Sequence, residues 1–122
     1  MDCPKCLGEL SAVFQGVTNV DRCGNCQGLF FDQLTQALLE AVMVQAGTID
    51  LGKGEKDSAF DDMVYVECPK CDKIMDQRLI EEPNRIRFEL CPTCNATFLD
   101  AGELREYISP RFIEDFKSLL PE

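Results

Sequence analysis

Four Cys-x-x-Cys pairs constrain what this 122-residue chain can fold into more than any other feature of its sequence. Sixteen residues separate the first two pairs, and 19 residues separate the last two. Two residues between cysteines form a tight turn that directs both sulfurs to one point, and two such turns complete a tetrahedron of thiolates around zinc. The sequence therefore predicts two zinc ions per chain, one bound by Cys3, Cys6, Cys23 and Cys26 and the other by Cys68, Cys71, Cys91 and Cys94.

The chain contains no histidine, and this absence limits its chemistry. It excludes mixed Cys/His metal sites, acid–base catalysis by histidine, and Ser-His or Cys-His catalytic pairs. Four cysteine ligands also leave no open coordination position at zinc for a reactive water. We therefore predict structural zinc sites and no enzymatic activity.

The sequence has neither the pattern of a secretory signal nor that of a membrane span. An acid stands at position 2, and no basic segment precedes an apolar one. The longest apolar stretch, residues 37–44, is interrupted by Glu40 and is far shorter than the roughly 20 residues that a spanning helix needs. We expect a soluble, cytoplasmic protein with no membrane contact, in which reduced cysteines bind metal rather than form disulfides.

The chain also repeats itself. The sequence Cys-Pro-Lys-Cys at residues 3–6 recurs letter for letter at residues 68–71. Each half then places a phenylalanine four residues, and an aspartate six residues, after its last cysteine. These residues are Phe30 and Asp32 in the first half and Phe98 and Asp100 in the second.

The repeat predicts two modules, residues 1–47 and residues 64–122. A segment of glycines and charged residues at 48–63 is the predicted linker. Modules of this size bury little apolar surface, so zinc should supply much of their folding free energy.

Each module has the pattern of a β-hairpin between its cysteine pairs and of a short third strand after the second pair. The hairpins are predicted at residues 10–22 and 74–90, and the third strands at 29–31 and 97–99. Apolar and charged residues alternate through 85–90, which predicts a half-buried strand.

Helical patterns follow each ribbon. A helix is predicted at residues 33–46, with Asp32 as its cap, and a shorter one after Asp100, which forms an acidic capping box with Glu103. The predicted fold is thus a small, zinc-dependent α+β structure. It has two tandem zinc ribbons, each followed by a helix, and a C-terminal amphipathic helix whose apolar face is Phe112, Ile113, Phe116, Leu119 and Leu120.

The residues after each second cysteine pair carry a family resemblance. The second half has Cys94, Phe98, Leu99, Asp100, Gly102, Glu103 and Leu104, and the first half keeps Cys26, Gly28 and Asp32. Both halves resemble the transcription-factor-IIB-type zinc-ribbon family of small, mostly bacterial proteins, whose motif is C-P-x-C, a hairpin, and C-P-x-C-G-G-x-W-L-D-x-G-E-L. Phenylalanine replaces the tryptophan in both halves, and the first half has Gln33-Leu34-Thr35 where the family has x-G-E. The resemblance, which leaves out the linker and the last helix, implies zinc ribbons and, by analogy of fold, a link to transcription.

The leading functional hypothesis is a non-enzymatic zinc-binding adaptor that presents surfaces to a protein partner. The helix at 33–46 motivates it, because its apolar residues spread beyond the roughly 100° stripe that a surface helix needs. We expect this helix to be covered either by the C-terminal helix or by a second copy of the chain, so a homodimer through residues 33–46 is a further hypothesis.

Two alternatives remain open. Arg78, Arg85 and Arg87 on the second hairpin suggest nucleic-acid binding through the second ribbon, although 22 acidic against 12 basic residues and a net charge of −10 disfavour it. The second alternative is a redox- or zinc-responsive regulator, because oxidation of the cysteines would release metal.

Overall fold

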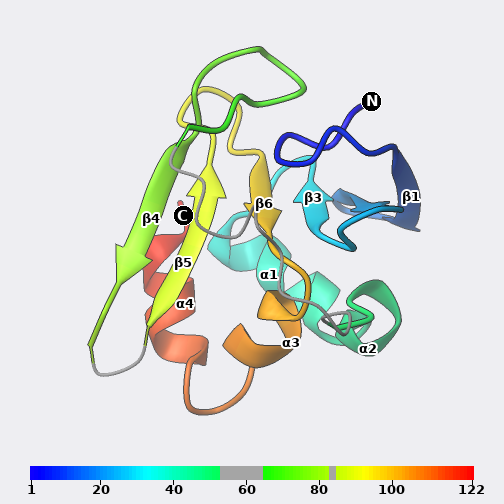
Figure 1. Cartoon of the computed structure of the whole chain (residues 1–122). Coiled ribbons are helices and arrows are strands. Elements are labelled where there is room, and N and C mark those ends of the chain that lie inside the picture. The colour runs from blue at the N-terminus through cyan, green and yellow to red at the C-terminus, as the bar shows by residue number, and fades with distance from the viewer. Residues whose placement is uncertain (53–64, 83–84) are drawn as a thin grey trace.

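The computed structural model describes residues 1–52, 65–82 and 85–122 (Figure 1). Within these residues, six strands and four helices form the predicted α+β fold with its two tandem ribbons. None of the described helices is long and apolar enough to cross a membrane. The strands are β1 (Leu10–Gln15), β2 (Asn19–Cys23), β3 (Leu29–Phe31), β4 (Asp76–Ile80), β5 (Ile86–Leu90) and β6 (Thr97–Leu99); the helices are α1 (Gln36–Met43), α2 (Ala46–Ile49), α3 (Glu103–Tyr107) and α4 (Ile113–Leu119).

Each ribbon is a three-stranded antiparallel unit, as the sequence predicts. In the first ribbon β1 pairs with β2, and β2 pairs with β3, with an irregularity in β1 between Ala12 and Phe14. In the second ribbon β4 pairs with β5, and β5 pairs with β6. The predicted turn of the second hairpin includes residues 83–84, which lie outside the described part of the chain.

The two ribbons join through their third strands into a single sheet of order β1-β2-β3-β6-β5-β4. Strand β3 runs antiparallel to β6, and Phe30 stands directly opposite Phe98. Because these phenylalanines hold matching positions in the sequence repeat, the pairing relates the two ribbons by an approximate two-fold axis. In Figure 1 the two third strands lie side by side at the centre of the molecule.

The helices pack with the sheet around a core that both ribbons share. Phe88 of β5 meets Phe116 of α4 edge to face, with ring centroids 5.3 Å apart. The core takes buried residues from both halves of the chain, which are Val20, Leu29, Phe31, Leu34, Leu39, Val42, Ala46 and Ile49 from the first and Ile86, Phe88, Leu90, Leu99, Leu104, Tyr107, Phe116 and Leu120 from the second. The division into modules at 1–47 and 64–122 stays a prediction, since most of the predicted linker at 48–63, namely residues 53–63, lies outside the described residues.

The predicted helix at 33–46 is shorter in the structure and is covered by the C-terminal segment. It begins at Gln36, because the Thr35 side chain accepts a hydrogen bond from the Leu38 amide, and the regular helix ends at Met43. The Gln36 amide donates to the carbonyl of Pro121 at 2.9 Å. Of the two expected covers, the structure therefore shows the C-terminal one; a homodimer through this helix remains a prediction.

The prediction of a half-buried strand at 85–90 is wrong for β5. All five residues of this strand are buried, including Arg87 at 8% and Glu89 at 2% exposure. Glu89 is buried because Lys5 of the first ribbon reaches across to it, with its Nζ 3.2 Å from Oε1. Alternation along one strand does not reveal a partner charge from elsewhere in the chain.

Candidate zinc centres

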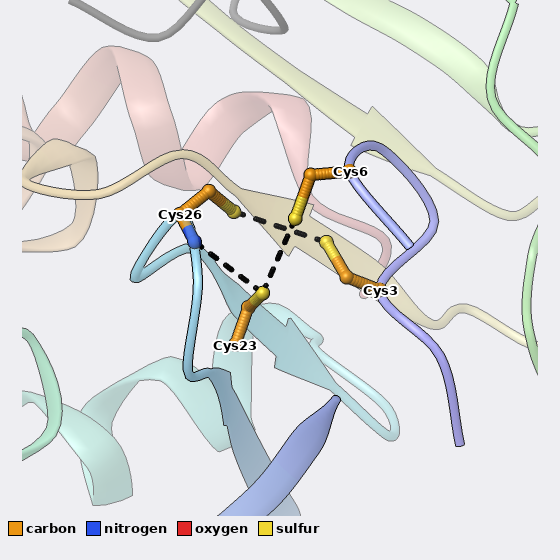
Figure 2. A group of neighbouring side chains, drawn as sticks. All are labelled: Cys3, Cys6, Cys23 and Cys26. Carbon is orange, nitrogen blue, oxygen red and sulfur yellow. Dashed lines mark hydrogen bonds between the residues drawn. The ribbon is translucent and has the colours of Figure 1, made fainter. Parts of the chain in front are cut away.

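The first cysteine set converges on one point from two turns (Figure 2). The sulfurs of Cys3 and Cys26 lie 3.8 Å apart, and those of Cys6 and Cys23 lie 3.3 Å apart. All four sulfurs lie within 4.8 Å of one another. A regular tetrahedron with Zn–S bonds of about 2.3 Å has edges of about 3.8 Å, so this cluster has the size that zinc requires.

The second set has the same geometry. The Cys68 and Cys94 sulfurs are 3.7 Å apart, and the Cys71 sulfur lies 3.3 Å from that of Cys91 and 3.9 Å from that of Cys94. Again all four sulfurs lie within 4.8 Å of one another. The structure thus brings each predicted set of ligands together, and the chain has sites for two zinc ions.

All four cysteine turns share one backbone conformation. The residue after each pair has a positive φ of 58° to 65°, and its amide donates to the carbonyl of the first cysteine in the pair. Non-glycine residues rarely adopt this left-handed conformation, which costs about 1 kcal/mol or more. Its presence four times shows that all four turns have the same local geometry. The four residues are Leu7, Gln27, Asp72 and Asn95.

Two glycines of the first ribbon allow close approach to its centre. A Cβ on Gly8 would lie 2.8 Å from the sulfur of Cys23. A Cβ on Gly28 would lie 2.4 Å from the ring of Phe98, which belongs to the second ribbon. Gly28 therefore fits the first ribbon's second turn directly against the other half of the chain.

Without metal, the thiols hold their protons unevenly. The hydrogen bond from Cys26 lowers the pKa of Cys3 to about 5, and the same bond raises the pKa of Cys26. Burial raises the pKa of Cys68 to about 12. Because zinc binds thiolates, occupation of either centre must displace thiol protons.

The lysines of the repeated Cys-Pro-Lys-Cys turns cross between the ribbons. The Nζ of Lys5 in the first ribbon lies 2.9 and 3.0 Å from the two carboxylate oxygens of Asp100 in the second. The Nζ of Lys70 in the second ribbon lies 2.8 Å from Asp32 Oδ1 in the first. The two ion pairs obey the same approximate two-fold axis as Phe30 and Phe98.

These pairs correct the prediction that the two aspartates cap helices. Asp32 and Asp100 direct their carboxylates to the lysines, and Thr35 caps α1 instead. Part of the capping box is present, since Glu103 Oε1 accepts from the Asp100 amide at 2.8 Å. The prediction failed because the lysine partners stand more than 30 positions away in the sequence.

Helix α3 receives its cap from the first half of the chain. The buried carboxylate of Asp50, just after α2, accepts hydrogen bonds from the amides of Gly102 and Arg105 at 2.9 and 3.1 Å. Sequence reasoning missed Asp50, which has no local motif. It also missed Lys5 and Lys70, although the exact repetition of their tetrapeptide was a usable signal.

The fold and the two four-cysteine centres define a zinc-binding protein built from tandem ribbons. Residues 2–41 match the family whose description is transcription factor zinc-finger, which bears out the resemblance for the first ribbon. The second ribbon lies outside this match but has its own four-cysteine group. The chain shows no significant match to a curated protein or to a solved structure.

Proposed function

We propose that the protein is a non-enzymatic zinc-binding adaptor, and that a groove between its two Cys-Pro-Lys-Cys turns receives a protein partner. The groove has a volume of about 380 Å³ and is lined by both ribbons. The first ribbon contributes Asp2, Pro4 and Leu7 to it, and the second contributes Glu67, Pro69 and Asp72.

The chemistry of this groove supports a partner segment that combines basic and apolar side chains. Three carboxylates line it, and none of the lysines and arginines in the described part of the chain does. Leu7 is 76% exposed on its wall, and Met1 is 52% exposed. Exposed apolar side chains that gather beside a concave surface are consistent with a binding site. The net charge of −10 favours a basic partner over an acidic one.

The groove needs both ribbons and therefore depends on zinc. Two of its lining residues, Cys3 and Cys68, are ligands, one from each centre. Loss of either metal would displace one wall. The match of the first ribbon to transcription factor zinc-fingers supports a partner in the transcription apparatus.

Site-specific crosslinking tests this proposal. A photoreactive residue in place of Leu7 should capture a partner in extracts of the native host. The same residue in place of Val44, which is 80% exposed at the end of α1 and does not line the groove, should not. Charge reversal by Glu67→Lys with Asp72→Lys should abolish the Leu7 product, while Glu114→Lys should leave it. Equal products at both positions, or a Leu7 product insensitive to charge reversal, would contradict the groove as the binding site.

The structure gives less support to nucleic-acid binding than to a redox- or zinc-responsive role. Arg87 is buried in β5, which removes it from the basic face expected for nucleic-acid binding. The second cysteine of every pair is partly exposed, which supports oxidant access in the redox- or zinc-responsive alternative. Zinc release measured with a dye during titration with a peroxide, in which thiolates are oxidised to disulfides as the peroxide is reduced, tests that alternative.

A further inference from the structure

Each zinc centre is supported by residues of the opposite ribbon. Lys5 stands within the first Cys-x-x-Cys turn, and its ammonium group contacts Asp100 and Glu89 of the second ribbon at 2.9 and 3.2 Å. Glu89 stands two residues before the ligand Cys91, and it pairs in the sheet with Phe98. A short path of contacts therefore leads from the ligands of one centre to those of the other.

A second contact joins the centres at Gly28. This glycine follows Cys26 by two residues, and its position against the Phe98 ring leaves no space for a side chain. Phe98 is fully buried, as is Phe30 opposite it, and both belong to one cluster with ligands from both centres. That cluster contains Cys3 and Cys23 of the first centre and Cys68 and Cys91 of the second.

We propose that the two centres load and lose zinc as one unit, with Lys5 as a positioning residue that supports the second centre from the first ribbon. The metal at the first centre fixes the turn that carries Lys5, and this turn places the ammonium group between two buried carboxylates. When the first turn loosens, Glu89 and Asp100 lose that positive charge in a buried environment, and the strand leading to Cys91 is weakened. Because coupling between two binding sites is reciprocal, metal at the second centre strengthens the first equally.

The two crossing lysines differ in how much they contribute. The Lys5 side chain is 1% exposed, and that of Lys70 is 33% exposed beside an Asp32 that is 45% exposed. Solvent screens an exposed pair, so Lys70 supports the first centre only weakly. Coupling should therefore depend on Lys5 far more than on Lys70. This inference concerns the metal centres alone and does not depend on the identity of a partner.

Disabling one centre in the full chain tests the coupling. The Cys6→Ser variant removes a ligand of the first centre, and zinc affinity at the second is measured by competition with a chromophoric chelator. Alkylation of Cys71 and Cys94, read peptide by peptide, reports the same centre independently. We expect the affinity to fall at least about tenfold relative to the intact chain. An affinity within about twofold of the intact chain would overturn the proposal.

Substitution of Lys5 tests the path of the coupling. Lys5→Met should speed alkylation of Cys71 and Cys94 at least about tenfold. Lys70→Met should change the alkylation rates of Cys6 and Cys26 by less than about threefold. Lys73→Met, at an exposed lysine, is the matched control. Adding Glu89→Gln and Asp100→Asn to Lys5→Met should restore protection of the second centre, because it removes the two carboxylate charges that the Lys5 ammonium group contacts. Faster alkylation confined to the first centre, or no rescue by the neutral pair, would show that Lys5 supports only its own turn.

Discussion

The same residue at the same motif position makes the same contact in both halves of this chain but is buried to a different degree. Lys5 and Lys70 occupy equivalent places in identical tetrapeptides, and each contacts the aspartate of the opposite ribbon. Burial by itself lowers the pKa of Lys5, but the charges of Asp100 and Glu89 together outweigh it, so the pKa is raised above its usual value. Loss of one partner from a buried ion cluster costs about 3 to 5 kcal/mol, whereas an exposed pair contributes about 0 to 1 kcal/mol. The two identical motifs therefore contribute unequally to the stability of the fold.

Asp50 should matter more than a surface carboxylate, because it caps α3 from another part of the fold. Its carboxylate accepts from the amides of Gly52, Gly102 and Arg105. We expect Asp50→Ala to lower the free energy of unfolding by about 2 kcal/mol. The exposed Asp76→Ala should change it by less than about 0.5 kcal/mol. Urea unfolding of the zinc-loaded proteins measures both, and equal values for the two variants would contradict the cap.

Two glycines offer a matched test of the contact between ribbons. A methyl group on Gly28 would meet the buried Phe98 ring at 2.4 Å, so Gly28→Ala should destabilise the protein by about 1 to 3 kcal/mol. Gly47 in α2 has no atom of the described residues within 4 Å of such a methyl group, so Gly47→Ala should be neutral or stabilising by up to about 1 kcal/mol. Thermal unfolding of both variants measures these effects. An unchanged melting temperature for Gly28→Ala would show that the ribbons do not pack this closely.

Zinc affinity should fall with acid. Burial raises the pKa of Cys68 to about 12, so the metal-free thiol is protonated at neutral pH and must lose its proton when zinc binds. Proton release on binding means that affinity rises with pH and falls as pH is lowered. We expect at least a tenfold loss of affinity between about pH 8 and about pH 6, measured by chelator competition. An affinity that is constant over this range would contradict binding by thiolates.

At the scale of elements, the sequence predicted what local chemistry determines and missed what distant residues determine. The cysteine turns, the hairpins and both third strands follow from spacing and alternation within about 20 residues. The burial of Glu89, the role of Asp100 and the cap of α3 depend on Lys5 and Asp50, which lie in the other half of the chain. No local pattern contains that information.

Because the C-terminal segment covers one side of α1, charged substitutions on its buried and exposed sides should have different effects. Leu39 is fully buried in the core cluster that also contains Phe116 and Leu120, and Val44 just past the helix is 80% exposed. We expect Leu39→Asp to destabilise the fold by about 3 kcal/mol or more, because it buries a charge and removes apolar contact. Val44→Asp should have little effect on unfolding. Zinc content should stay at two ions per folded chain in both, measured by elemental analysis; an unchanged melting temperature for Leu39→Asp would mean that the helix is open to solvent.

In the whole molecule, the two repeated ribbons pack against each other much as the two subunits of a symmetric dimer do. The matched phenylalanines meet at the centre of the six-stranded sheet, and the matched aspartates receive the lysines of the opposite ribbons. One core takes side chains from both halves, and one cluster holds ligands from both centres. A chain arranged in this way should gain and lose its two metals together.

Native mass spectrometry during chelation shows whether the two zinc ions are lost together. The full chain, purified under reducing conditions, should carry two zinc ions. As a chelator is added, the two-zinc form should convert to the metal-free form with little one-zinc intermediate, and the circular-dichroism signal should fall in parallel. A one-zinc form that dominates the middle of the titration while the circular-dichroism signal stays constant would contradict coupled loss of the two metals. Fewer than two zinc ions at the start would contradict the two predicted sites.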